Sequence, residues 1–161
     1  MQPKTNIVKG DKLNLRNKPY AELVCFLLFI ARYTRSDVLY AVTVLCRYLT
    51  CYSEDLFGSA IRILQYLQHT ADKKLTYVRQ ENSKTLELYC DPDWCNKELI
   101  TVDVRCASGC VIMYQGNAVD WSCQKQQDVS LSTTEAEYKQ LTYGMKQTMY
   151  FINLLQEEMK I

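Results

Sequence analysis

The feature that most constrains the fold is a change in the spacing of apolar residues near Lys74. Before Lys74, apolar side chains recur every three or four residues, which is the period of an amphipathic helix. After it they alternate with polar side chains, which is the period of a half-buried strand. A last helical stretch over residues 132–158 follows the strands. The order of three helices, then strands, then a helix predicts an α/β chain.

Three helices are expected between residues 19 and 70. Pro19 opens the first, because a proline at the first helical position loses no hydrogen bond. Ser36 and Asp37 can cap the second, and Ser53 starts the third. The expected apolar faces are Leu23, Phe26, Leu27 and Ile30 in the first helix, Val38, Ala41, Val42, Leu45 and Leu49 in the second, and Leu56, Ala60, Ile63, Leu64 and Leu67 in the third. Tyr33, Tyr40, Tyr48 and Tyr66 fall on or near these faces, which favours core packing for them over stacking on nucleic-acid bases.

Strands and turns are expected from Lys74 onward. Residues 75–78 suggest a first strand and residues 81–84 its turn. Residues 86–90 alternate and end at Asp91, and residues 92–105 read as a loop. A strand over 108–114 leads to a hairpin turn at Gly116 and Asn117, and residues 118–123 form the returning strand. Ser132, Thr133 or Thr134 then caps the last helix.

Composition limits the class of protein. Hydrophobic residues make up 48% of the 161 residues, which indicates a folded, core-forming chain. The net charge of +1 lacks the basic excess typical of tight nucleic-acid binding, although a local patch can still make contacts. No apolar run approaches the roughly 18 residues that span a bilayer. Residues 1–18 are polar, like a linker or a cut end, and have no signal-peptide pattern. We therefore expect an intracellular chain that is not secreted and not bound to membrane.

The eight cysteines form no C-x-x-C pair, and the only histidine is His69. Zinc sites use tighter paired spacings, so a cysteine-based zinc protein ranks last among the alternatives. Without a secretory signal, no disulfide is expected either. The cysteines are interpreted as free and mostly buried thiols.

Carboxylates occur at two places that a fold can bring together. Asp91 and Asp93 follow a strand in CDPDW, and Glu135 and Glu137 lie in the first turns of a helix in STTEAEY. Phosphodiester hydrolysis with two divalent metals requires several carboxylates aimed at one point, and Mg²⁺ prefers such oxygen ligands. Acidic residues also favour a helix's first turn, and Asp is an ordinary turn residue. On spacing alone, the structural interpretation is therefore preferred to metal chemistry.

Four segments carry a resemblance that changes this weighting. They are PYAELVCFLLFIARYTRSDVLYAV, LCRYLTCYSEDLFGSAIRILQYLQHTADKKLTY, YCDPDW and ASGCVIMYQGNAVDWSCQKQQDVSLSTTEAEY. In this order they resemble successive segments of Copia-type retrotransposon Pol polyproteins, along nearly the whole chain from Pro19. The third resembles the "YSDADW" strand end that begins ribonuclease H, and the fourth the block ending in "SSTEAEY".

The resemblance implies a three-helix reverse transcriptase connection, or thumb-like segment, over residues 19–72. An incomplete ribonuclease H-like fold of antiparallel strands and a long helix would follow over residues 73–161. The family enzyme uses two Mg²⁺ ions to cleave RNA in RNA–DNA hybrids. The resemblance assigns Asp91 and Glu137 as catalytic and metal-binding residues, with Glu135 as the alternative for the second. It further suggests that Ser132 and Thr133 contact the hybrid, that Asp93 is structural, and that Trp94 packs.

The sequence also departs from the family. The family's third Asp, in a "CDN" strand after this helix, and a later fourth ligand do not occur before Ile161. The polymerase aspartate pair would lie before Met1. The expectation is thus a Pol fragment that is inactive or nearly so alone. Its expected partners are the RNA–DNA hybrid and the remainder of the polyprotein, including the polymerase palm, in the cytoplasm, a virus-like particle or the nucleus. The alternative is a non-catalytic relic or a co-opted nucleic-acid or protein binding module.

Overall fold

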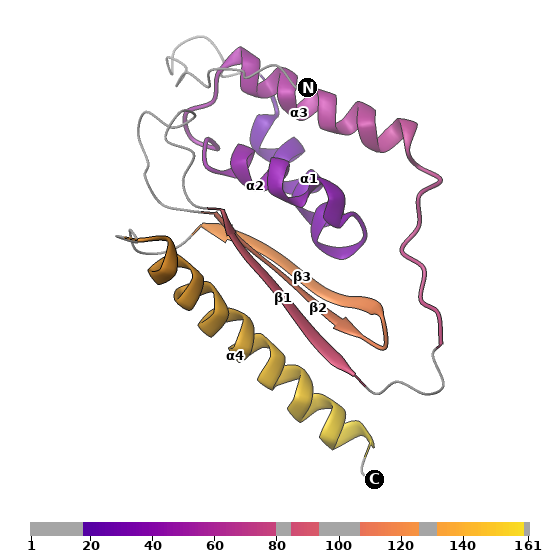
Figure 1. Ribbon diagram of the computed structural model, residues 1–161. Helices are drawn as coiled ribbons and strands as arrows, with labels where there is room; N and C mark the ends of the chain where they lie inside the picture. Colours follow the sequence, from indigo (N-terminus) through magenta and orange to yellow (C-terminus); the bar gives the residue numbers. More distant parts are fainter. Residues whose placement is uncertain (1–17, 80–84, 94–106, 126–131, 160–161) are drawn as a thin grey trace. The chain divides into compact units, whose positions relative to one another are not determined.

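The computed structural model describes residues 18–79, 85–93, 107–125 and 132–159. They form two compact units (Figure 1). We call described residues 18–75 the helical unit and the described residues from 76 onward the sheet unit. Among these residues, no helix is both long and apolar enough to cross a membrane. The two units match the predicted change from helical to strand periodicity near Lys74.

Three α-helices and one short 3₁₀ turn build the helical unit. Helix α1 spans Tyr20–Tyr33, η1 Ser36–Val38, α2 Leu39–Cys46 and α3 Glu54–His69. Helix α1 packs against both α2 and α3. The Ser53 side chain accepts a hydrogen bond from the Leu56 N–H (3.4 Å), as predicted for the start of α3. The buried apolar side chains of this unit are Tyr20, Val24, Leu27, Ala31, Val38, Leu39, Val42, Leu45, Leu56, Ala60 and Leu67.

The predicted apolar face of α1 was partly wrong. Its buried residues are spaced by four, three and four positions from Tyr20 to Ala31, whereas Phe26 is 57% exposed. The segment from Leu23 to Ala31 is apolar on every side, so periodicity alone cannot choose the face. Core packing was also the wrong expectation for Tyr33, Tyr40 and Tyr66, which are exposed.

The buried tyrosine of the helical unit is Tyr20. Its hydroxyl donates to the Leu45 carbonyl (2.9 Å), and its ring stacks on Tyr52 at 4.3 Å between centroids. Burial raises the pKa of the Tyr20 hydroxyl. This one side chain therefore joins the start of α1 to the end of α2 through a satisfied polar group.

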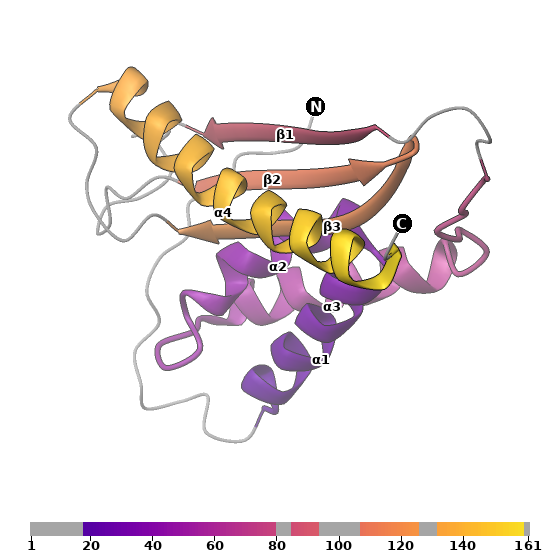
Figure 2. The ribbon, with the colours of Figure 1, turned by 90° about the horizontal axis from the view of Figure 1, so that it is seen from below.

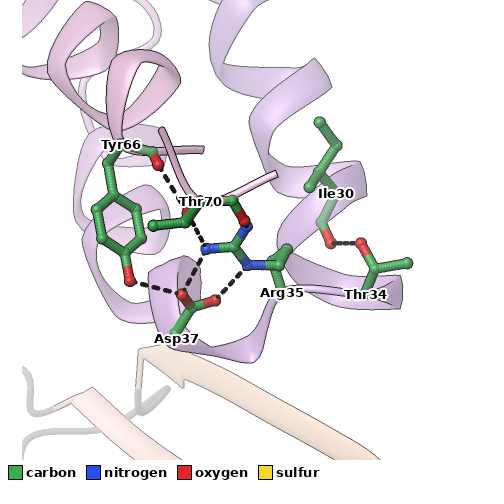
Figure 3. Close-up of polar contacts among 6 residues, drawn as sticks. All are labelled: Ile30, Thr34, Arg35, Asp37, Tyr66 and Thr70. Carbon is green, nitrogen blue, oxygen red and sulfur yellow. Dashed lines mark hydrogen bonds and ion pairs between the residues drawn. The ribbon is translucent and has the colours of Figure 1, made fainter. Parts of the chain in front are cut away.

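Arg35 links the α1–α2 joint to the end of α3 (Figure 3). Its guanidinium donates to both carboxylate oxygens of Asp37 (3.0 and 2.8 Å) and to the carbonyl and hydroxyl of Thr70 (3.0 and 2.7 Å). The Tyr66 hydroxyl also donates to Asp37 (2.9 Å). Hydrogen bonds from Arg35 hold the pKa of the Asp37 carboxyl below its usual range. Asp37 was predicted to cap α2, but its carboxylate instead completes this network.

Three antiparallel strands and one helix build the sheet unit. Strand β1 spans Leu86–Asp93, β2 Ala107–Tyr114 and β3 Asn117–Lys125, in the order β1-β2-β3. Helix α4, Thr133–Met159, packs on β1 and β2 (Figure 2). Gln115 and Gly116 form the β2–β3 turn with positive φ angles of 51° and 73°. The predicted turn was thus one residue too late, because Asn117 already belongs to β3.

The strand predicted at residues 75–78 does not form, and these residues are exposed. The Asn117 side chain takes the place of a neighbouring strand there. It accepts from the Val78 N–H (2.7 Å) and donates to the Val78 carbonyl (2.9 Å). One amide group can satisfy a single residue's backbone but cannot continue a ladder. The turn predicted over residues 81–84 and most of the loop predicted over 92–105 lie outside the described residues.

We expect Arg35→Ala to destabilise the helical unit by about 2 kcal/mol, because it removes several charge-assisted hydrogen bonds from a buried guanidinium. Urea unfolding followed by circular dichroism measures the change. Arg32→Ala is the matched control, since Arg32 is exposed on the last turn of α1. Equal midpoints for the two variants would refute the structural importance of the Arg35 network.

Candidate active site at one end of the sheet unit

The N-terminal end of α4 lies at the end of the sheet where β1 finishes (Figures 1 and 2). This arrangement follows from direction, because α4 runs antiparallel to β1. Asp91 is near the end of β1, and Glu137 lies in the first turns of α4. Both side chains are exposed. The fold therefore brings the two predicted carboxylate-bearing segments to one end of the sheet unit.

Ser132 caps α4. Its hydroxyl accepts a hydrogen bond from the Glu135 N–H (3.1 Å), and its carbonyl accepts one from the Ala136 N–H (3.2 Å). Glu135 forms an ion pair with Lys139 one turn later (2.8 Å). Of the three predicted caps, the first is thus the one used, and Thr133 is the first residue of the helix. Nucleic-acid contacts by Ser132 and Thr133 stay a prediction.

Gln140 anchors α4 beside Asp91. Its side chain is buried, with 2% exposure, and its Nε2 donates to the Gly109 carbonyl (2.9 Å). Gly109 is the cross-strand partner of Asp91. Because Gln140 lies one turn after Glu137, this bond fixes the first turns of α4 to β2, at the residue opposite Asp91. The sequence analysis did not identify Gln140. The sequence contains a signal for it, because Ala136, Gln140 and Gly144 are spaced by four and so lie on one face of the helix, with the polar Gln140 between two small residues.

Gly144 brings α4 into close contact with β1. A Cβ atom at this position would lie 2.6 Å from the Cys90 Sγ and 3.0 Å from a Leu88 methyl carbon. The helix can therefore approach β1 this closely only with a glycine here. Burial raises the pKa of the Cys90 thiol, as expected for a group enclosed between a helix and a sheet.

The contacts at Gly144 also identify the face on which each β1 side chain lies. Leu88 and Cys90 point toward α4, so alternation places Asp91 on the opposite face of β1. Asp91 and Glu137 thus share one end of the unit without both lining the helix–sheet contact. The side chain of Asp93, and Trp94 altogether, lie outside the described residues.

The donor atoms suit Mg²⁺ in kind but not in number. Carboxylate oxygens are the ligands that Mg²⁺ prefers. However, within the described ranges no group of three or more His, Cys, Asp or Glu side chains could hold a metal ion. The assignment of Asp91, Glu137 and the alternative Glu135 as metal ligands stays a prediction, and we assign no catalytic step to a metal here.

The cysteines of the described part are not mostly buried, contrary to the prediction. Cys110 is buried, Cys25 is exposed, and Cys46, Cys51, Cys90 and Cys123 are half-buried. A cysteine side chain is small enough to lie at the boundary of the core, so its apolar character does not determine how deeply it is buried.

Comparisons with known proteins identify relatives along nearly the whole chain. The chain is 30% identical over 155 residues to the retrovirus-related Pol polyprotein from transposon RE2 of Arabidopsis thaliana, covering 96% of this chain and 10% of that polyprotein. It is 31% identical over 148 residues to the corresponding polyprotein from transposon TNT 1-94 of Nicotiana tabacum, covering 91% and 11%. The chain thus spans about one tenth of the length of these polyproteins.

A third relative is much shorter. The chain is 29% identical over 136 residues to secreted RxLR effector protein 161 of Plasmopara viticola, and the match covers 84% of this chain and 93% of that protein. No family model matches the chain. No solved structure matches it either.

We expect Gly144→Ala to destabilise the sheet unit by about 1 kcal/mol net, since overpacking against Cys90 outweighs the better helix propensity of alanine. Gly58→Ala in α3 is the matched control. A Cβ there meets no atom within 4 Å, so the change should stabilise by about 0.5–1 kcal/mol.

Thermal and urea unfolding measure both variants. Adding Cys90→Ala to Gly144→Ala should recover part of the loss, because it removes the sulfur atom that the new Cβ would meet. Stabilisation by Gly144→Ala alone would show that α4 does not need its close approach to β1.

Proposed function

Since the chain belongs to the Copia-type retrotransposon Pol polyproteins, of which it spans about a tenth, we propose that its sheet unit is a ribonuclease H-like part of such a polyprotein. In this proposal the helical unit is the reverse transcriptase connection that precedes it. The substrate would be the RNA strand of an RNA–DNA hybrid. Alone, the chain binds divalent metal weakly and cleaves the hybrid little or not at all.

One observation carries the proposal. Asp91 near the end of β1 and Glu137 in the first turns of α4 lie at the same end of the sheet unit, where Gln140 of α4 donates to the carbonyl of Gly109, the β2 residue that pairs with Asp91. Asp91 lies on the face of β1 opposite α4, so the two exposed carboxylates would supply oxygen ligands to Mg²⁺ together with further Pol residues at this end. Ser132 and Thr133 lie at the same end, where N–H groups of the first turn of α4 favour an anionic backbone.

The proposal includes weak activity because two carboxylates give too few ligands. Two-metal hydrolysis requires a cluster that holds both ions about 3.5–4 Å apart. The described residues supply no group of three ligands. Asp91 and Glu137 would therefore act as part of a larger site that other Pol residues complete.

The activity test uses the whole chain with Mg²⁺ and a labelled RNA–DNA hybrid. We expect no cleavage above that of Asp91→Asn. Cleavage by the wild-type chain that disappears in Asp91→Asn would contradict the predicted inactivity while supporting the assigned residue. A bacterial ribonuclease H on the same hybrid confirms that the substrate is competent.

Metal binding is tested separately with Mn²⁺ as a paramagnetic substitute for Mg²⁺. Amide signals near Asp91 and Glu137 should broaden on titration, and Asp91→Asn or Glu137→Gln should weaken the effect severalfold, because each removes one of two ligands. Glu157→Gln is the control, since Glu157 is exposed on the last turns of the same helix. Equal broadening in all four proteins would refute a site at these carboxylates.

A second candidate function is a non-catalytic binding module. The match to the Plasmopara viticola effector favours it, because a segment similar to this chain makes up 93% of that protein. Fluorescence anisotropy with a labelled hybrid separates the two candidates. A binding module should bind equally in Mg²⁺ and in EDTA, whereas a ribonuclease H-like site should bind more tightly with Mg²⁺ and lose that difference in Asp91→Asn.

A further inference from the structure

We propose that Cys90 and Cys110 form an oxidative modification site, at which a hydroperoxide converts two cross-strand thiols to a disulfide. The site is independent of the proposed function. The sequence analysis expected no disulfide, and both thiols are free in the structure, so the proposed bond would form only on oxidation.

The strand register places the two cysteines directly opposite each other. Cys90 on β1 pairs with Cys110 on β2. The Gln115 N–H donates to the Thr85 carbonyl (3.1 Å), so hydrogen-bonded pairs fall at odd positions of β1. Cys90–Cys110 is therefore a non-hydrogen-bonded pair, in which the two Cα atoms lie about 4.5 Å apart. A disulfide accepts Cα separations of about 4.4–6.8 Å.

The two side chains lie on the same face of the sheet. Cross-strand partners share a face, and Cys90 points toward α4. The Ser122 hydroxyl donates to the Cys110 sulfur (3.6 Å) on this face. Bond formation therefore requires side-chain rotation rather than movement of the strands.

The two cysteines differ in access, which assigns their roles. Cys90 is half-buried, whereas Cys110 is 2% exposed. The Cys90 thiol first gives its proton to solvent. The thiolate then takes the terminal OH group of the hydroperoxide and becomes a sulfenic acid, while the O–O bond breaks and the leaving alkoxide or hydroxide takes up a proton to depart as an alcohol or water. The Cys110 thiol then attacks the Cys90 sulfur, so that the S–S bond forms and the sulfenic oxygen leaves as water. The two thiols lose two electrons, which reduce the peroxide.

The bond would join β1 to β2 at the residue before Asp91. It closes a loop between two positions that are 20 apart in the sequence. Such a link restricts the unfolded chain, so the oxidised protein should melt at a higher temperature than the reduced one.

The test treats the whole folded chain with hydrogen peroxide, alkylates the remaining thiols, and maps peptides by mass spectrometry without reduction. We expect a linked Cys90–Cys110 peptide pair, two hydrogens lighter than the separate peptides, that dithiothreitol separates. Cys90→Ser and Cys110→Ser should each abolish it. Cys123→Ser is the matched control, because half-buried Cys123 lies on β3 and should not affect the link.

Three results would overturn the proposal. Both cysteines could be alkylated fully after peroxide treatment, Cys90 could link to a different cysteine, or Cys90 could advance to a sulfinic acid without linking. Circular dichroism of each variant confirms that it is folded. The wild-type map tests the proposal even where a serine variant fails to fold, and repeating the treatment in urea should remove the selectivity for this pair.

Discussion

The close contact between α4 and β1 at Gly144 is the constraint on which the sheet unit depends. A three-stranded sheet exposes both faces, and α4 is the described element that covers one of them. The cover is effective because glycine lets the helix backbone meet Leu88 and Cys90 directly. Four residues earlier in α4, Gln140 donates to the Gly109 carbonyl of β2 and fixes the position of the helix along that strand. These two contacts, one apolar and one polar, determine where the first turns of α4 lie.

In the helical unit, a charged side chain, that of Arg35, fixes the arrangement of the helices. In α1 apolar side chains lie on all sides, so hydrophobic burial alone leaves the arrangement of the helices poorly specified. Arg35 resolves this, because its planar guanidinium can satisfy Asp37 and Thr70 together in only one arrangement of the joint and α3. Removing either partner would leave donors unpaired in a half-apolar setting, which is more costly than losing an exposed ion pair.

The sequence predicted the fold where local signals and burial agree. Alternation along residues 86–90 predicted β1, although the strand continues two residues beyond the predicted end at Asp91. Ser53 and the first of the three candidate caps, Ser132, predicted the starts of α3 and α4, because a capping hydroxyl acts within its own turn. Prediction was wrong where the deciding partner is distant in sequence. Residues 75–78 have strand-like composition but form no strand, and the Asn117 amide bonds to the backbone of Val78 there. Phe26 is exposed because packing selected another face of α1. The positions of Asp91 and Glu137 follow from predicted elements, whereas Gln140 required the structure.

The candidate site and the stability of the sheet unit are physically separate. Asp91 and Glu137 are exposed, so their charges stay solvated and the fold does not need a metal ion to neutralise them. The contacts that position them come instead from Gln140, Gly144, Leu88 and Cys90, which would not bind Mg²⁺. A chain of this kind can therefore stay folded whether or not further ligands complete its site. Because the fold does not depend on the metal site, the same packing contacts are compatible with a catalytic part of a polyprotein and with a self-standing binding module. For the same reason, loss of either carboxylate should reduce metal binding without unfolding the sheet unit.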